Sequence, residues 1–164
     1  MTSILKVNWD SNLPIYGISQ SELQQKGIEC ILLDVDGTLI NINSTKIPKA
    51  VKSWISKSKK LFSLYLISNN PSKKRIEKIA KELNLRYKYN ASKPRKKVTL
   101  IAIKEVNYEL KNIAIIGYRI FTDIIVGNRC NIKTILVKRL NRDGLPIKFN
   151  LTLTIEKLIS HFIK

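Results

Sequence analysis

The chain has 164 residues, 44% of them hydrophobic, which is enough for one domain with a sizeable core. Lys and Arg total 30 against 12 Asp and Glu, so the formal net charge is +18 at pH 7. No apolar stretch approaches the roughly 18 residues of a membrane-spanning helix, and residues 1–10 lack the apolar core of a signal peptide. We therefore expect one cytoplasmic domain over residues 1–164, with an N-terminal arm at 1–27 and a C-terminal helix at 150–164.

The strong positive charge has two explanations. It should draw the molecule to anionic surfaces such as phospholipid headgroups or nucleic acid. A chain rich in Lys, Ile and Asn is also expected from an AT-rich genome, in which exposed positions drift to lysine. Composition alone does not separate a functional basic face from this drift.

The cysteines and the histidine argue against a zinc site or a disulfide framework. Cys30 and Cys130 lie in apolar or helical patterns without a C-x-x-C spacing, and the chain contains one His. This usage suits a reducing compartment and agrees with the cytoplasmic location expected above.

Apolar runs alternate with helix-like segments along the chain. Strands are predicted at about 30–34, 61–67, 112–116 and 132–137, with a short one at about 86–89. Alternation of this kind predicts βαβ units with right-handed crossovers around a parallel sheet, so the expected fold class is α/β.

Helices are expected between these strands. Val51, Trp54 and Ile55 recur at helical spacing after Pro48, and a second helix opens at Pro71. That second helix is amphipathic, with an apolar side and a strongly basic side that includes Lys73, Lys74, Arg75, Lys78 and Lys81. Two more helices are expected at about 95–108 and 121–130.

The first apolar strand ends in two carboxylates and a glycine. Its sequence, Ile-Leu-Leu-Asp-Val-Asp-Gly-Thr-Leu-Ile at 31–40, would place Asp34 and Asp36 on one face if the strand continued, and Gly37 ends it. One carboxylate can then act as a nucleophile and the other as an acid or base, with a hard cation neutralising both them and a bound phosphate. The alternative is an ordinary βα turn whose acidic residues cap the next helix.

This run resembles the first motif of the haloacid dehalogenase (HAD) superfamily, and three later segments can be compared with its other motifs. The Ile-Ser-Asn-Asn segment at 67–70 resembles the second motif, an apolar strand that ends in a hydroxyl residue. The Lys-Pro pair at 93–94 resembles the third. The Gly-Tyr-Arg-Ile-Phe-Thr-Asp segment at 117–123 stands where the superfamily has G-D-x-x-x-T-D.

Within the superfamily the chain is most similar to the YqeG-type phosphatases of subfamily IIIA, which are related to phosphatidylglycerophosphate phosphatases. The similarity covers roughly residues 13–140 and includes Gly-Asn-Arg at 127–129. It departs at Gly37, where that group more often has Asn, and at Asn131, where Gly is usual. Asn tolerates the left-handed conformation after a helix, so the second change is mild.

The resemblance implies a three-layer Rossmann-like fold with a central parallel sheet. The connections at 40–46 and 84–94 are too short for an additional cap domain, so little or no cap is expected. An open active site would suit a large or surface-presented substrate.

The resemblance also implies roles for individual residues. Asp34 would attack phosphorus to form an aspartyl-phosphate, while Asp36 protonates the leaving oxygen and later activates water. Ser68 and the backbone amide of Asn69 would bind the phosphoryl oxygens, and Lys93 would stabilise the transferring group and orient Asp34. The expected cofactor is Mg²⁺, with a ligand set of Asp34, the Val35 carbonyl, Asp36 and Asp123.

Each of these residues also has a plainer interpretation. Ser68 is a reasonable strand-end cap, and Lys93 is one of many lysines. Asp123 follows Thr122 in a good helix N-terminal signal, so it is also explained as a cap of the 121–130 helix.

The fourth motif is altered at Tyr118, where the superfamily supplies a metal-binding aspartate. A phenol of pKa about 10 is a poor ligand for a hard cation, so Mg²⁺ affinity should fall. Three outcomes stay open at this point: Asp123 reaches the ion directly or through water, the site works at raised Mg²⁺, or catalysis has been lost.

The C-terminal segment has apolar residues at helical spacing after a basic loop. Its apolar members are Leu151, Ile155, Leu158, Ile159 and Phe162, and the loop contains Lys138, Arg139, Arg142 and Lys148. A helix of this kind either lies on a membrane surface or packs against the sheet.

The leading hypothesis is a magnesium-dependent phosphomonoesterase that acts on phosphatidylglycerophosphate, in the cytoplasm or peripherally at the inner face of the membrane. Its partner is then a phosphate monoester, which is lipid-linked in this case. The alternative is a catalytically impaired HAD-like module that binds an anionic partner such as RNA or a membrane surface. No RNA-binding motif accompanies the basic clusters, so nucleic acid is the weaker choice.

Overall fold

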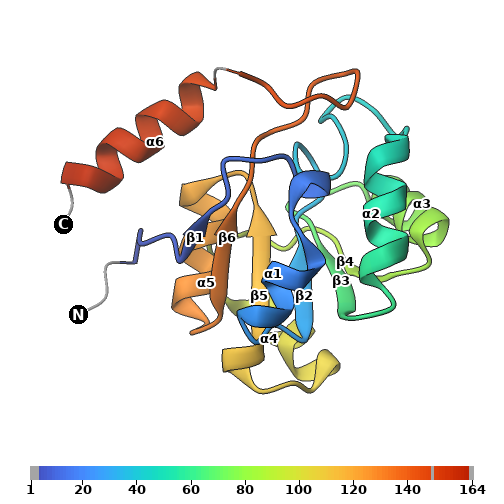
Figure 1. The fold of residues 1–164 in the computed structure, drawn as a ribbon, viewed down its shortest axis with the longest axis horizontal. Helices are drawn as coiled ribbons and strands as arrows, with labels where there is room; N and C mark the ends of the chain where they lie inside the picture. Colours follow the sequence, from blue (N-terminus) through green and yellow to red (C-terminus); the bar gives the residue numbers. More distant parts are fainter. Residues whose placement is uncertain (1–3, 149, 163–164) are drawn as a thin grey trace.

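The computed structural model describes residues 4–148 and 150–162, and these form a parallel sheet between helices (Figure 1). The strand order is β1-β6-β5-β2-β3-β4, and every neighbouring pair is parallel. The strands are β1 (Trp9–Asp10), β2 (Cys30–Leu33), β3 (Ser63–Ile67), β4 (Arg86–Lys88), β5 (Ile113–Gly117) and β6 (Lys133–Leu136). This confirms the predicted α/β class and places each predicted strand within about two residues of its expected bounds.

Helices cover both faces of the sheet because its central strands are apolar on both sides. Ile31 and Leu33 face one core with α1, α2 and α3, whereas Cys30 and Leu32 face a second core with α4 and α5. The helices are α1 (Gln20–Gln25), α2 (Lys49–Ser58), α3 (Lys73–Leu83), α4 (Lys97–Val106), α5 (Ile125–Arg129) and α6 (Leu151–Phe162). The result is the three-layer arrangement expected from the sequence.

Several elements differ from the sequence-based expectation. The structure adds the edge strand β1 and the short helix α1 within the segment expected to be an N-terminal arm. Short helical turns also occur at η1 (Ile15–Gly17) and η2 (Leu110–Asn112). The single helix expected at 121–130 is instead a π-helical turn, η3 (Ile120–Ile124), followed directly by α5.

The connection from β2 to α2 contains no inserted domain. Residues 34–48 form the acidic turn and a short loop, with one isolated bridge between Asp36 and Ile40. The carboxyl ends of the strands are therefore not covered by a cap from this connection. None of the helices in the described ranges has the length and hydropathy that are needed to cross a lipid bilayer.

Helix α6 stands apart from the two helical layers and lies on the side of the molecule toward which the strands point (Figure 1). Its Leu153 packs against a small cluster that contains Ile120, Ile124 and Leu136. Part of the predicted C-terminal helix, namely the side chain of Phe162 and residues 163–164, lies outside the described part of the chain. Residues 1–3 of the predicted N-terminal arm also lie outside it.

Candidate active site

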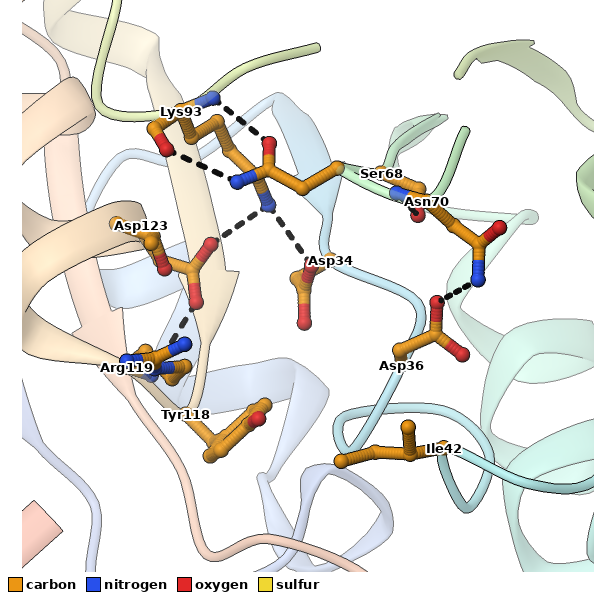
Figure 2. Close-up of a pocket in the computed structure, with 11 residues that line it drawn as sticks. Asp34, Asp36, Ile42, Ser68, Asn70, Lys93, Tyr118, Arg119 and Asp123 are labelled. Carbon is orange, nitrogen blue, oxygen red and sulfur yellow. Dashed lines mark hydrogen bonds and ion pairs between the residues drawn. The ribbon is translucent and has the colours of Figure 1, made fainter. Parts of the chain in front are cut away.

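The predicted site residues meet at the carboxyl edge of the sheet (Figure 2). Asp34 follows β2, Ser68 follows β3 and Tyr118 follows β5, which is where ligands bind in open parallel sheets. They line one cavity of about 190 Å³. The cavity lining also contains Asp36, Ile42, Asn69, Asn70, Lys93, Arg119, Thr122 and Asp123.

Lys93 joins the two acids, Asp34 and Asp123, that line this cavity. Its ammonium donates to Asp34 Oδ1 at 2.8 Å, to Asp123 Oδ1 at 2.6 Å and to the Ile67 carbonyl at 3.1 Å. The Lys93 side chain is 1% exposed, so these contacts are shielded from water. An ammonium has three N–H donors, so these three acceptors satisfy it completely although it is buried. This pairing distinguishes Lys93 from the exposed lysines of the chain.

Burial is the largest cause of a raised pKa at Asp34. The charge of Asp123 raises this pKa as well, Lys93 and the Thr38 hydroxyl oppose the rise, and the resulting value is about 6. Thr38 donates to Asp34 Oδ2 at 2.9 Å. Burial alone would lower the pKa of Lys93, but Asp123 and Asp34 outweigh it and hold the ammonium charged.

Asp123 reaches Lys93 because the backbone at Gly117 leaves room for it. A Cβ at Gly117 would lie 2.3 Å from Asp123 Cγ, so no other residue fits there without a shift. The second oxygen of Asp123 accepts from the Arg119 amide at 3.2 Å. Asp123 is thus fixed toward the lysine, and its side chain does more than cap the helix that follows.

Asn69 fixes the backbone of Lys93. Its side-chain amide donates to the Lys93 carbonyl at 2.9 Å, and its carbonyl oxygen accepts from the Lys93 amide at 2.7 Å. Ser68 Oγ accepts from the Asn70 amide at 3.0 Å, which leaves its own proton available for a bound anion. The role expected for the Asn69 backbone amide stays a prediction.

Asp36 is held at the other end of the cavity. One carboxylate oxygen accepts from Arg75 of α3 and the other accepts from Asn70 Nδ2 at 3.0 Å. The prediction that Arg75 lies on the exposed basic side of its helix is wrong, because its side chain is only 16% exposed. No local pattern separates Arg75 from the neighbouring cations, so its role emerges only from the fold.

Tyr118 fills the corner of the cavity beside the acidic turn. Its ring covers Gly37, where an added Cβ would lie 2.5 Å from Tyr118 Cε1. Burial raises the pKa of the phenol and the charge of Asp34 raises it further, so the hydroxyl is neutral near pH 7. Two of the departures from the family pattern, at 37 and at 118, are therefore in contact.

The prediction that the Val35 carbonyl binds the metal does not agree with the hydrogen bonds that this oxygen accepts. Its oxygen accepts from the backbone amides of Thr38, Leu39 and Ile40 at 2.9–3.3 Å, so it is committed to the turn. Among the described residues, no group of three or more His, Cys, Asp or Glu side chains is arranged to hold a metal ion.

The remaining donors still suit one loosely held hard cation. Asp34 and Asp123 converge on the same ammonium and together exceed its charge, and carboxylate oxygen is the ligand type that Mg²⁺ prefers. Mg²⁺ commonly keeps several waters and only one or two protein carboxylates. The donor set therefore fits a weak magnesium site built on Asp34 and Asp123. Asp36, which was also predicted as a ligand, is instead paired with Arg75 and Asn70.

Comparison with known proteins identifies the family. A family model described as mitochondrial PGP phosphatase matches residues 2–140. The chain belongs to this family. PGP phosphatases are phosphoric monoester hydrolases, and the chain is accordingly a HAD-type phosphatase. The matched region ends before α6, so the C-terminal helix lies outside the shared part.

A curated relative and two solved structures agree with this assignment. The chain is 26% identical over 137 residues to a Bacillus subtilis protein named "Probable phosphatase YqeG", covering 83% of this chain and 80% of that protein. An uncharacterised protein from Listeria monocytogenes has a TM-score of 0.56 at 16% identity, covering 83% and 98% of the two chains. A Bacillus subtilis protein described as the "putative HAD-hydrolase YfnB" bound to magnesium has a TM-score of 0.55 at 12% identity, covering 84% and 99% of the two chains. The two structures show that the fold is shared.

Proposed function

We propose that this PGP phosphatase family member is a magnesium-dependent phosphomonoesterase that acts through an aspartyl-phosphate on Asp34. The observation that carries the proposal is the buried Lys93, which bridges Asp34 and Asp123 beside Ser68 at the carboxyl edge of the sheet. A nucleophilic carboxylate whose orientation is fixed by a cation suits phosphoryl transfer, because catalysis of this reaction consists mainly of positioning and electrostatic stabilisation.

The residues of the cavity have distinct roles in this proposal. Asp34 attacks phosphorus, and the bond to the leaving oxygen breaks as Asp36 supplies a proton to it. Asp36 then takes a proton from the water that hydrolyses the aspartyl-phosphate, which releases inorganic phosphate and restores the free carboxylate. Ser68 donates to a phosphoryl oxygen, and Lys93 balances the charge on Asp34 and the transferring group.

Asp34 and Asp123 are the side chains that would hold the metal. When bound, Mg²⁺ supplies charge neutralisation and polarises the phosphoryl oxygens. Tyr118 contributes a neutral hydroxyl in place of a third carboxylate, so the proposal includes a magnesium requirement above that of a site with a complete fourth motif.

The small cavity and the family description support a lipid-linked substrate. Pockets that enclose whole drug-sized ligands have volumes of roughly 300–1,000 Å³, so the present cavity of about 190 Å³ holds a phosphoryl group and little more. The rest of the substrate then lies outside, as suits a headgroup presented at a surface. We propose phosphatidylglycerophosphate as this substrate, met at the inner face of the cytoplasmic membrane.

Phosphate release from an aryl phosphate, titrated with Mg²⁺, tests the proposal. We expect release by the intact protein and a loss of roughly 10³-fold or more in Asp34→Asn, because the nucleophile is removed. Asp143→Asn is the matched control, since it makes the same change at an exposed carboxylate outside the cavity. Release that persists in Asp34→Asn would contradict the mechanism, and no release from either protein would favour the non-catalytic binding module.

A further inference from the structure

A second groove lies between α6 and the loop that follows β6. It has a volume of about 160 Å³ and is lined by four cationic side chains, Lys138, Arg139, Lys148 and Lys157. The one acidic lining residue, Asp10, is paired with Lys157 at 2.6 Å. The groove is therefore strongly positive and attracts anions.

Two hydrogen-bond donors in this groove are unused. The Nε atom of Arg139 and the Nδ2 atom of Asn150 are buried, and neither has a hydrogen-bond partner among the described residues. A buried donor without a partner destabilises a protein by about 1–3 kcal/mol, and most buried donors are satisfied. Both side chains line the groove, so a phosphate bound there could supply the missing acceptor after a small side-chain shift.

The groove adjoins the active site. The Arg139 guanidinium lies 5.6 Å from the centre of the Tyr118 ring, and Tyr118 lines the catalytic cavity. Glu156 of α6 accepts from the Ile120 amide at 2.8 Å and from Arg119 Nη2 at 3.2 Å, just after the end of β5. Helix α6 is thus attached to the start of η3, the turn that carries Asp123.

The outer face of α6 is apolar and exposed. Leu151, Ile155, Leu158 and Ile159 are spaced at i, i+4, i+7 and i+8, and their exposed fractions range from 36% to 61%. An exposed apolar helix face beside a cluster of cations is the pattern of a helix that lies in a membrane interface.

We infer that the groove binds the phosphate of an anionic phospholipid while the outer face of α6 enters the bilayer surface. The cations account for the choice of an anionic surface, and the apolar face accounts for the choice of a lipid over a nucleic acid. The inference rests on the proposed function for its catalytic consequence, namely that a lipid-linked phosphomonoester is presented to the neighbouring cavity. The binding itself is independent of catalysis.

Co-sedimentation with vesicles tests the binding. The probes are phosphatidylcholine vesicles with and without phosphatidylglycerol, and the protein is the full chain carrying Asp34→Asn. We expect binding only to the anionic vesicles. Lys148→Gln should weaken it about fivefold because one cation is removed from the lipid surface. Ile155→Gln should weaken it about tenfold because an apolar side chain no longer enters the interface.

Lys60→Gln and Leu61→Gln are the matched controls. Both residues are exposed and lie in the turn before β3, at the amino ends of the strands, whereas the groove lies beyond the carboxyl end of β6. Neither change should alter vesicle binding. Equal weakening by the controls, or equal binding to neutral and anionic vesicles, would overturn the inference. The outer face of α6 could instead contact RNA or a second copy of the chain. If Ile155→Gln weakened binding to RNA or abolished a dimer and left vesicle binding unchanged, the inference would also be overturned.

Activity separates the inference from the proposed function. In the chain with Asp34 intact, Lys148→Gln should leave turnover of a soluble aryl phosphate unchanged and lower turnover of vesicle-embedded phosphatidylglycerophosphate about fivefold. If the protein hydrolyses neither substrate but the binding pattern holds, the proposed function fails and the lipid site stands. If both substrates are hydrolysed and Lys148→Gln affects neither, the lipid site fails alone.

Discussion

The two sides of the catalytic cavity differ in how closely they follow the family pattern. The lysine side, consisting of Asp34, Lys93 and Asp123, keeps each residue that the pattern requires, and every partner is in place. The tyrosine side, consisting of Gly37 and Tyr118, departs at both positions. Removing one partner of a buried ion pair leaves an unpaired charge, which strongly destabilises the protein, so these residues cannot change one at a time. A metal ligand can change more easily, because water or a neighbouring side chain can take its place.

The lysine side is predicted to be the less tolerant of change. Lys93→Met leaves two buried carboxylates without their shared cation, so it should lower the free energy of unfolding by about 3–5 kcal/mol and abolish turnover. Urea unfolding followed by circular dichroism measures the first effect. Lys97→Met, at an exposed lysine at the start of α4, should stay within about 0.5 kcal/mol of the unaltered chain.

A second substitution checks the reason for this loss. Adding Asp123→Asn to Lys93→Met removes one of the two uncompensated charges, so it should recover part of the lost stability. No recovery in the double variant would mean that lost packing of the lysine stem, and not unpaired charge, explains the destabilisation.

On the tyrosine side, introducing a carboxylate at position 118 should improve metal binding. Tyr118→Asp is expected to raise turnover and to lower the Mg²⁺ concentration for half-maximal activity about tenfold, since carboxylate replaces a neutral phenol. Tyr118→Asn controls for the loss of the ring without adding charge. No change in either quantity would mean that Asp123 already provides the metal site.

The contact between Gly37 and Tyr118 sharpens the same prediction. Gly37→Asn should be poorly tolerated in the unaltered chain because its Cβ would meet the tyrosine ring, and it should be better tolerated in the Tyr118→Asp background. Thermal unfolding of the four proteins gives the coupling energy between the two positions. A coupling of zero would show that the two departures are independent.

The raised pKa of Asp34 predicts how activity depends on pH. A carboxylate attacks only when ionised, so turnover should fall as the pH drops through about 6. Because the folded-state pKa lies above the unfolded value of 3.8, ionisation of Asp34 opposes folding, and its contribution to stability should improve as the pH falls from about 7 to 4.

Asp123→Asn should move the acid limb of the pH profile to lower pH, because the neighbouring charge is the second cause of the shift after burial. Asp143→Asn should leave the limb in place. Profiles recorded at a fixed Mg²⁺ concentration measure both. An unmoved limb in Asp123→Asn would assign the observed titration to another group.

Much of the fold follows from local sequence signals. The buried strands are continuous apolar runs, and the four segments that carry Asp34, Ser68, Lys93 and Asp123 converge as expected, because parallel strands present their carboxyl ends at one edge. Strand β1 escaped detection because it has two residues and obtains its hydrogen bonds from β6, more than a hundred residues away.

The contacts that complete the site have no such signal. The pairing of Arg75 with Asp36 joins residues 39 apart, and Glu156 meets Arg119 over a separation of 37. In a chain with 30 Lys and Arg residues, no periodicity marks which cation is turned inward. Similarly, the orientation of the Val35 carbonyl depends on how tightly the turn at Gly37 closes.

The two hydrogen bonds between the Asn69 side chain and the Lys93 backbone have a consequence for how the protein responds to its substrate. They tie the loop after β4 to the end of β3 before anything is bound, so the lysine is already in position and little ordering remains for the encounter. We therefore expect the free and phosphate-bound forms to superimpose closely around Lys93, with adjustment confined to Asp36 and its partners. The active site is therefore expected to be pre-organised, with little conformational change when substrate binds.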